Sequence, residues 1–542
     1  MKKFIILFVA VVFVVSFGLM GVSCKTSGAG ETTAGETTAG ETVKETAAEK
    51  VAIDELTIGM EADIDTLDPI TGTNVAGQLM KQLCYNGLVS LGKNFEVVPG
   101  IAEKWDISED QTEYTFYLKK GVKFHNGREL TSEDVKWTYD AYRNPKIGYS
   151  FNSDFTPIKN IEIIDDYTVK ITLNKPYSSF LAGIAGGYGH PILAKESFTE
   201  GEDGILKFNQ LIGTGPYKFV EWLPDESFKI TAFEDYWAGA PNVKNITFKV
   251  VVDENVRVSA LKAGDLDIVR LPNPEEIVKY KENPAKDYVL DVAEGTQSII
   301  SVFVFNHDKG PTKDIKVRQA IQYTIDVEAV NEAINKGLGT TPNGFYPNGS
   351  IWATGIPNIK PDLEKAKKFL ADAGYANGLT LTILTCPEYK WDKRAEIYAA
   401  ELAQIGIDLK INSVEFAKQV VLQSEMNWEV LTGGHGISAD EGVILNTVLR
   451  TGGDFNWWWG NYHSPEIDKL LDEAGATTDI AKRQEIYKEI HKIFMAEAGG
   501  IFVDQMPLTY GYRSEFKGIE FNTRGDFIFD NNKGIGWITQ SN

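Results

Sequence analysis

A strand, a helix and a second strand follow one another within the segment 379–413 of this 542-residue chain. Leu379–Thr385 and Asp408–Ser413 alternate apolar and polar residues, and Lys393–Ile405 between them has the apolar spacing of an amphipathic helix. Two strands joined by a crossover helix pair in parallel, because the helix returns the chain to the end of the sheet at which the first strand began. The succession therefore predicts a lobe of the α/β class.

The chain is too long for one hydrophobic core, because single cores stop growing at about 250–300 residues. Apolar residues make up 43% of the chain and aromatic residues 11%, which is enough for two or three lobes. The region 114–173 differs from the rest, since its short alternating strands and the Asn126–Gly127 turn predict β-structure. Thr131 followed by acidic residues predicts the start of a helix. A single further helix is expected over 317–335.

The first 23 residues have the pattern of a secretory signal. Two lysines precede the apolar run Phe4–Val15, and small residues follow it up to Cys24. A cysteine in this place resembles the lipobox of bacterial lipoproteins, in which the thiol is acylated and becomes the new N-terminus. The resemblance implies that 1–23 is a lipoprotein signal peptide and that Cys24 is lipidated. The alternative is an uncleaved membrane anchor, for which the run is short of the roughly 20 residues that a span needs.

Residues 24–50 are rich in Thr, Ala, Gly and Glu and repeat the letters ETTAG. Such a segment cannot bury enough apolar surface to offset its ordering entropy, so we expect a disordered tether. No second long apolar run follows it. The rest of the chain is therefore expected to be a soluble body that touches the membrane only through its N-terminus.

The net charge of −22 argues against a nucleic-acid partner, because phosphates require clustered Lys and Arg. Besides Cys24, the chain has only Cys84 and Cys386. A disulfide between these two remains open, and two buried thiols are favoured. The six histidines lack the spacing of a metal site, so we expect neither a metal nor a cofactor.

Several short motifs follow one another between Leu56 and the C-terminus. They are Tyr85–Val89, Val98–Trp105, Gly121–Gly127, Leu130–Val135, Gly213–Phe219, Ala263–Ile268, Val317–Ile321 and Tyr462–Asp468. In this order they resemble the extracellular solute-binding proteins, family 5, which is the dipeptide- and oligopeptide-binding family of ABC importers. The resemblance covers nearly the whole chain after the tether.

The resemblance implies a two-lobed fold of the periplasmic-binding-protein type II kind, with an extra β-rich subdomain. Lobe I would comprise 51–300 with the subdomain at 90–208, lobe II 301–507, and 508–542 would return to lobe I. Such lobes close on a ligand without altering it and present it to a membrane permease that a separate ATPase drives. We therefore expect a monomeric binding protein, not an enzyme, that is exported and lipid-anchored and faces the periplasm or the cell exterior.

Candidate ligand contacts in lobe II follow from the same resemblance. In the peptide-binding relatives the ligand backbone pairs with extended protein segments, and its ammonium meets a buried acid. Here Gly434, His435 and Gly436 lead to Asp440, which is the matching acid. A carboxylate opposite an ammonium in a dry cleft gives both orientation and affinity. The alternative is that Asp440 only caps a helix that begins near Gly442.

In lobe I, the resemblance places Thr73, Asn74 and Val75 at the cleft, where they would offer hydroxyl, amide or backbone groups. The alternative is an ordinary turn.

Trp457, Trp458 and Trp459 precede the last family motif. Three consecutive indoles cannot share one face of a strand, so at least one points away from the core and could stack on a ligand. The alternative is a packed strand with one tryptophan at the rim.

Oligopeptides are the first expectation for the ligand. An oligosaccharide is the alternative, supported by the tryptophans and by Glu441-Gly442-Val443, which stand where the family often has an aromatic residue and Asp-Pro. A secreted two-domain hydrolase would need a nucleophile–base pair or a defined pair of carboxylates, and no motif selects one. A sensory receptor that hands its liganded surface to a signalling partner would use the same fold.

Overall fold

A computed structural model describes residues 52–542, except 73, 93–95, 187–189, 271–272, 347–349, 437–439, 454, 521–534 and 541–542. The chain divides into two units, Met1–Glu49 and Lys50–Asn542, and only the second contains described residues. The second unit carries its own hydrophobic cores, so we expect it to fold without the first. Cys24, the predicted signal peptide and the whole of the predicted tether lie outside the described residues.

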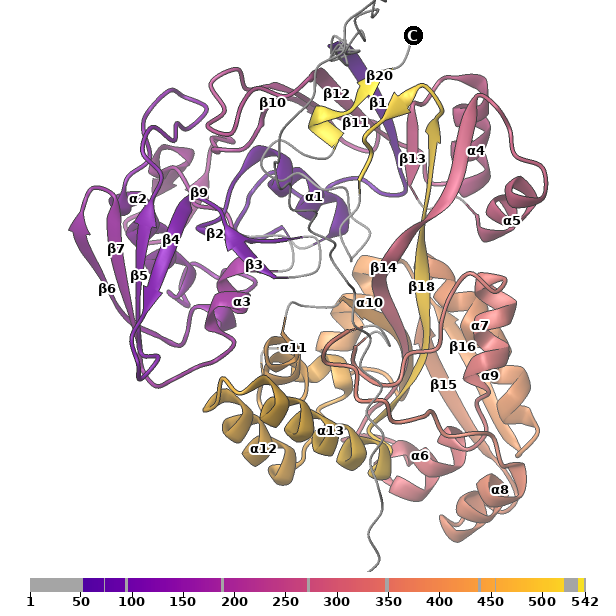
Figure 1. The fold of residues 1–542 in the computed structure, drawn as a ribbon. Coiled ribbons are helices and arrows are strands. Elements are labelled where there is room, and N and C mark those ends of the chain that lie inside the picture. The colour runs from indigo at the N-terminus through magenta and orange to yellow at the C-terminus, as the bar shows by residue number, and fades with distance from the viewer. Residues whose placement is uncertain are drawn as a thin grey trace, which may run out of the picture. The chain divides into compact units, whose positions relative to one another are not determined.

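A ten-stranded sheet runs through the second unit in the order β10-β11-β12-β1-β13-β18-β14-β17-β15-β16 (Figure 1). Its strands are β1 (Ile53–Met60), β10 (Tyr217–Leu223), β11 (Ser227–Ala232), β12 (Val243–Val250), β13 (Ile268–Arg270), β14 (Tyr288–Phe305), β15 (Leu379–Thr385), β16 (Ile407–Ser413), β17 (Val430–Gly436) and β18 (Gly500–Arg513). The long strands β14 and β18 pair with each other in antiparallel fashion and connect the two halves of the sheet.

We call the half built on β10–β13 and β1 lobe I, and the half built on β15–β17 lobe II. The pairing of β14 with β18 changes register between Val292 and Gln297 and again between Gln297 and Ile300. Such irregularities bend a strand pair locally. The two-lobed α/β class predicted from the sequence is confirmed, whereas the residue boundaries of the lobes stay a prediction.

Lobe I surrounds its strands with three helices, α1 (Val75–Cys84), α4 (Glu254–Ala263) and α5 (Pro274–Glu282). β1 pairs in parallel with both β12 and β13, and its apolar side chains are buried in the core. Asp253 caps the start of α4, and its carboxylate accepts hydrogen bonds from the N–H groups of Asn255 and Val256. Gly264 caps the other end with φ +83°. A side-chain cap at the start and a left-handed glycine at the end fix both ends of this helix.

The β-rich subdomain attached to lobe I contains a four-stranded sheet in the order β4-β5-β7-β6. Its elements are β2 (Val89–Leu91), β3 (Val97–Pro99), β4 (Ala102–Ile107), β5 (Glu113–Leu118), α2 (Ser132–Tyr142), η1 (Asn152–Asp154), β6 (Ile158–Asp165), β7 (Thr168–Leu173), α3 (Phe180–Ala185), η2 (Lys195–Ser197), β8 (Phe198–Glu200) and β9 (Leu206–Phe208). Every second residue of β5 is buried, as a strand with one covered face requires.

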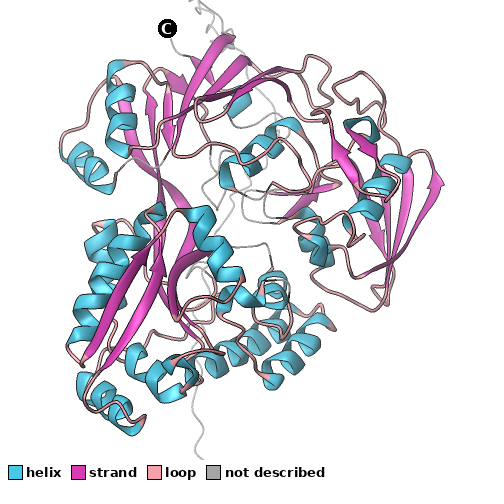
Figure 2. Ribbon diagram, turned by 180° about the vertical axis from the view of Figure 1, so that it is seen from behind, coloured by secondary structure: helices cyan, strands magenta, loops and turns pink. Residues whose placement is uncertain are grey.

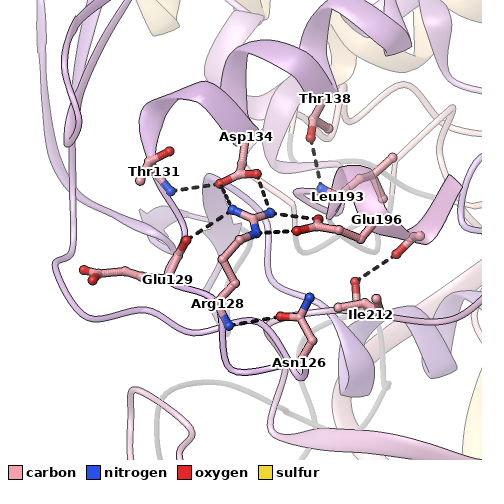
Figure 3. Close-up of polar contacts among 10 residues, drawn as sticks. Asn126, Arg128, Glu129, Thr131, Asp134, Thr138, Leu193, Glu196 and Ile212 are labelled. Atoms are coloured by element: carbon pink, nitrogen blue, oxygen red, sulfur yellow. Dashed lines mark hydrogen bonds and ion pairs between the residues drawn. The ribbon is translucent and has the colours of Figure 1, made fainter.

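Arg128 holds three parts of this subdomain together (Figure 3). It follows the Asn126–Gly127 turn, and its guanidinium contacts Asp134 of α2 at 2.8 Å and Glu196 of η2 at 2.6 Å. Asp134 also accepts a hydrogen bond from the N–H of Thr131, at the predicted start of the helix. The helix start predicted from the sequence is therefore confirmed.

Lobe II covers its strands with helices on both sides (Figure 2). They are η3 (Pro311–Lys313), α6 (Ile315–Gln322), α7 (Val327–Asn335), α8 (Leu363–Asp372), η4 (Glu388–Lys390), α9 (Trp391–Ala403), α10 (Phe416–Ser424), α11 (Glu441–Val448), η5 (Asn456–Trp459), α12 (Pro465–Gly475) and α13 (Ile480–Ala496). Val302 and Val304 of β14 enter one core, while Phe303 and Phe305 enter the other. This alternation places β14 between two helical layers.

Near the C-terminus the chain forms β19 (Phe516–Lys517), η6 (Ile535–Trp537) and β20 (Thr539–Gln540), and β19 pairs with β20. Among the described residues, no helix has the length and apolar character that crossing a bilayer takes. Nor does any group of three or more His, Cys, Asp or Glu within the described ranges have an arrangement suited to a metal ion.

Cys84 and Cys386 are both buried free thiols, so the interpretation of two buried thiols is confirmed. Burial raises the pKa of each thiol well above its ordinary value. Because the thiolate is the reactive form, we predict that Ellman's reagent modifies neither thiol in folded Lys50–Asn542 and both thiols in urea. Fast modification of the folded protein, or a missing thiol in urea, would contradict this arrangement.

Candidate functional site

A cavity of about 860 Å³ lies between the two lobes. Lobe I contributes the segments that follow β1 and β12, and lobe II contributes those that follow β15 and β16. Residues from both lobes and from β18 line it, among them Glu61, Arg257, Tyr389, Glu415 and Pro507. β1 and β12 are parallel, as are β15 and β16, so the carboxyl ends of both strand pairs open toward the cavity. This is where α/β sheets bind their ligands.

Charged side chains in the cavity wall hold the two lobes in register. Lys390 of η4 in lobe II lies 3.3 Å from Glu254 of α4 in lobe I. Glu254 also accepts a hydrogen bond from Asn273 at 2.8 Å. Arg257 donates to the carbonyl groups of Val251 and Val252 after β12, which fixes that loop. Burial lowers the pKa of Arg257.

Asp440 occupies the N-cap position of α11, and its Oδ1 accepts a hydrogen bond from the N–H of Gly442 at 2.8 Å. The same oxygen forms an ion pair with Arg483 of α13 and accepts a hydrogen bond from Ser179 of the β-rich subdomain at 2.8 Å. Burial lowers the pKa of Arg483, but the Asp440 charge outweighs it, so the net direction is upward. Asp440 therefore caps α11, and its contact with a ligand ammonium stays a prediction.

Gly434, His435 and Gly436 form the end of β17 and pair with residues 299–301 of β14. Gly434 is buried, and a Cβ at this position would lie 3.0 Å from the ring of Trp391 and closer still to Ile299. The glycine is therefore required for close packing of the strand. The residues that connect β17 to Asp440, 437–439, lie outside the described part of the chain.

Asn74 caps α1, because its Oδ1 accepts a hydrogen bond from the N–H of Gly77 at 2.7 Å. Its Nδ2 donates to the carbonyl of Asp63 at 2.8 Å. The amide is thus already used to fix the loop that follows β1. Val75 is the first residue of α1, and Thr73 lies outside the described residues. Ligand contacts of these three residues stay a prediction.

The alternative of a packed strand through Trp457, Trp458 and Trp459 is wrong, because these residues belong to the 3-10 helix η5. Their contact with a ligand stays a prediction. Successive side chains of a 3-10 helix point about 120° apart, so the three indoles diverge instead of alternating between two faces. Trp459 is fully buried in the lobe II core. Its neighbours there are Phe345, Phe494 and Phe502. Trp458 is half-buried near Gly433, and Trp457 packs against Phe455.

Three further residues at the lobe interface were not predicted from the sequence, namely Ser179, Arg483 and Lys390. Ser179 and Arg483 are separated by 304 positions and meet only in the folded chain. None of them belongs to a motif with a recognisable spacing. The helix α13 contains many charged residues, most of them exposed. Nothing in the sequence distinguishes the buried Arg483 from these exposed residues.

The model of the bacterial extracellular solute-binding proteins, family 5 Middle, matches residues 96–457. Heme-binding protein A of Haemophilus influenzae is 31% identical over 452 residues, which cover 77% of this chain and 80% of that protein. The dipeptide-binding protein of Escherichia coli is 29% identical over 483 residues, which cover 82% and 88%.

Among solved structures, the ABC transporter-associated periplasmic binding protein DppA of Helicobacter pylori, in complex with the peptide STSA, has a TM-score of 0.80 at 26% identity. The match covers 90% of this chain and 98% of that one. The family model spans more than half of this chain, and the matches confirm both the predicted family and the predicted fold class. The chain belongs to the bacterial extracellular solute-binding proteins, family 5.

Proposed function

We propose that this chain is the substrate-binding lipoprotein of an ABC importer that takes up short peptides. It acts as a monomer and captures a peptide between its lobes. An acylated Cys24 anchors it to the outer surface of the cell membrane. The liganded form then docks on a permease, and a separate ATPase supplies the energy. Support comes from family membership and from two relatives, one named for dipeptide binding and one solved with a bound peptide.

The stretch of β17 that extends beyond its pairing with β15 is the observation that carries the choice of peptide. Every residue of β17, from Val430 to Gly436, pairs with β14 on one side. On the other side β15 pairs with β17 only at Val430 and Leu431. Beyond Leu431, the strand pairs of the described residues give β17 no neighbour on the β15 side. An extended peptide can add to such an edge, because its N–H and C=O groups repeat with the spacing of a strand.

The stretch of β17 beyond β15 and the cavity both lie near the end of β15. β15 ends at Thr385, and Pro387, two residues further on, lines the cavity. The cavity volume of about 860 Å³ falls within the ~300–1,000 Å³ of small-ligand pockets. The tryptophans offer a sugar less than three exposed indoles would, since Trp459 is enclosed by core residues and Trp457 and Trp458 are partly buried.

A thermal-shift screen of Lys50–Asn542 against short peptides and matched oligosaccharides tests the proposal. A ligand that binds only the folded state at 100 times its Kd adds about 2.7 kcal/mol of stability, so we expect a clear rise in Tm with peptides. Isothermal titration then gives the Kd. A rise with oligosaccharides and none with any peptide would overturn the peptide proposal.

The predicted contact between Asp440 and a ligand ammonium is best tested on the ligand. Replacing Asp440 would also remove the cap of α11 and the partner of Arg483. N-acetylation of the peptide removes only the ammonium. If Asp440 holds the ammonium, the acetylated peptide binds much more weakly than the free peptide, and equal affinities contradict the assignment.

A further inference from the structure

The β-rich subdomain of lobe I touches the last helices of lobe II directly. The N–H of Ser178 donates to the carbonyl of Gly475 at 3.2 Å, at the end of α12. Gln111 donates to Thr478 at 3.0 Å on the surface. The subdomain thus approaches lobe II at a place separate from the cavity wall formed by η4 and α4.

Ser179 makes the buried part of this approach. Its Oγ donates to Asp440 Oδ1 at 2.8 Å and accepts from Arg483 Nη2 at 3.0 Å. A hydroxyl group can donate and accept at once, so one serine forms a hydrogen bond with each member of the ion pair. Ser179 is 1% exposed, Asp440 6% and Arg483 4%. We call this three-residue arrangement the closure contact.

Each partner of the closure contact is fixed within its own lobe. Arg483 is also held within lobe II, since its Nη2 donates to the Tyr487 hydroxyl at 2.7 Å and its guanidinium lies 4.8 Å from the Trp352 ring. Ser179 directly precedes α3, whose Phe180 and Ile184 are buried in the lobe I core. Both sides are anchored by residues of their own lobe, so breaking the contact would leave each of them in place.

We propose that Ser179 secures ligand-induced closure by inserting its hydroxyl into the Asp440–Arg483 pair. This inference rests on the proposed function, because closure is the step that traps the ligand. Removing a hydrogen bond from a buried ion pair is costly, so the serine favours the closed form over an open form in which water takes its place. The apparent affinity for a ligand that binds the closed form falls with the closed fraction.

The space around Ser179 makes this position sensitive to size. A Cβ on Gly442 would lie 2.6 Å from Ser179 Oγ, so α11 packs closely over the hydroxyl. Ser179→Ala removes the hydrogen bonds and leaves the fit. Ser179→Leu adds bulk that the closed form cannot accept but that an open form exposes to water. Gln111→Ala is the matched control, since it removes an exposed bond between the same two parts.

The experiment measures closure by single-molecule FRET in Lys50–Asn542, with dyes on Ile107→Cys and Ile480→Cys. Both positions are exposed, and they lie near the two ends of the Gln111–Thr478 contact. We expect a lower closed fraction in Ser179→Ala than in the wild type, with and without peptide, and almost none in Ser179→Leu. Peptide affinity falls about tenfold in Ser179→Ala, which corresponds to about 1.4 kcal/mol, and further in Ser179→Leu. Gln111→Ala behaves as the wild type, and the Tm without ligand is unchanged in every variant.

Equal closed fractions in the wild type and both Ser179 variants would overturn the inference. A matching drop in the ligand-free Tm would also overturn it, because it would assign Ser179 to folding and not to closure. If the wild type binds no peptide while its closed fraction still depends on Ser179, the inference stands and the proposed ligand class fails.

Discussion

Replacing Arg394 with alanine is expected to lower the free energy of unfolding of Lys50–Asn542 by about 3–5 kcal/mol. Arg394 of α9 and Asp504 of β18 form an ion pair in which both side chains are 0% exposed. The guanidinium donates from Nε to Oδ1 at 2.8 Å and from Nη2 to Oδ2 at 2.5 Å. The alanine variant leaves the carboxylate buried with only a neutral partner, the Nδ2 of Asn335.

Urea unfolding followed by fluorescence measures this loss. Lys393→Ala is the matched control on the same helix, because Lys393 pairs with Glu396 and both side chains are more than half exposed. Exposed ion pairs contribute only about 0–1 kcal/mol, so the control variant unfolds close to the wild type. Equal effects of the two substitutions would show that the Arg394–Asp504 pair does not stabilise lobe II.

Replacing Cys24 with alanine is expected to move the protein from the membrane fraction to the soluble exported fraction. The proposed anchor consists of acyl chains on Cys24, and two chains give a stable attachment to a bilayer. Without the thiol no chain can be added at this position. Cell fractionation with labelled fatty acid measures both the location and the modification.

Cys84→Ala is the control for this experiment, because Cys84 is buried in lobe I and should neither carry lipid nor affect location. If the Cys24 variant remained in the membrane, the apolar run Phe4–Val15 would act as an uncleaved anchor, and the lipoprotein proposal would fail.

The sequence predicts elements well where local signals agree. The predicted strand–helix–strand succession over 379–413 appears as β15, α9 and β16, and the two strands are parallel. The caps and periodicity of such elements are local properties that a single sequence displays. The helix start at Thr131 was predictable for the same reason.

Two differences show where local signals are insufficient. The single helix expected over 317–335 is broken into α6 and α7, because Asp326 caps the second helix by accepting from the N–H groups of Glu328 and Ala329. β14 runs without a break from Tyr288 to Phe305, although its segment 293–298 has no large apolar residue that would reveal a continuous strand in the sequence.

The candidate site was only partly predictable. Family motifs led to Asp440 and to the end of β17, but not to the partners that define their chemistry. Ser179 lies 261 positions from Asp440, and such a contact leaves no pattern in the sequence. Physical reasoning about one chain finds residues with suitable chemistry, whereas the fold decides which of them meet.

Native mass spectrometry of the protein purified from cells grown on a peptide-rich medium tests the central claim most directly. We predict a complex whose added mass equals that of an intact peptide, released unaltered when the protein is unfolded, and a Ser179→Leu variant that carries much less of it. Protein without any added mass, or a peptide that is recovered only as cleaved fragments, would contradict the account of a binding protein that traps its ligand unchanged.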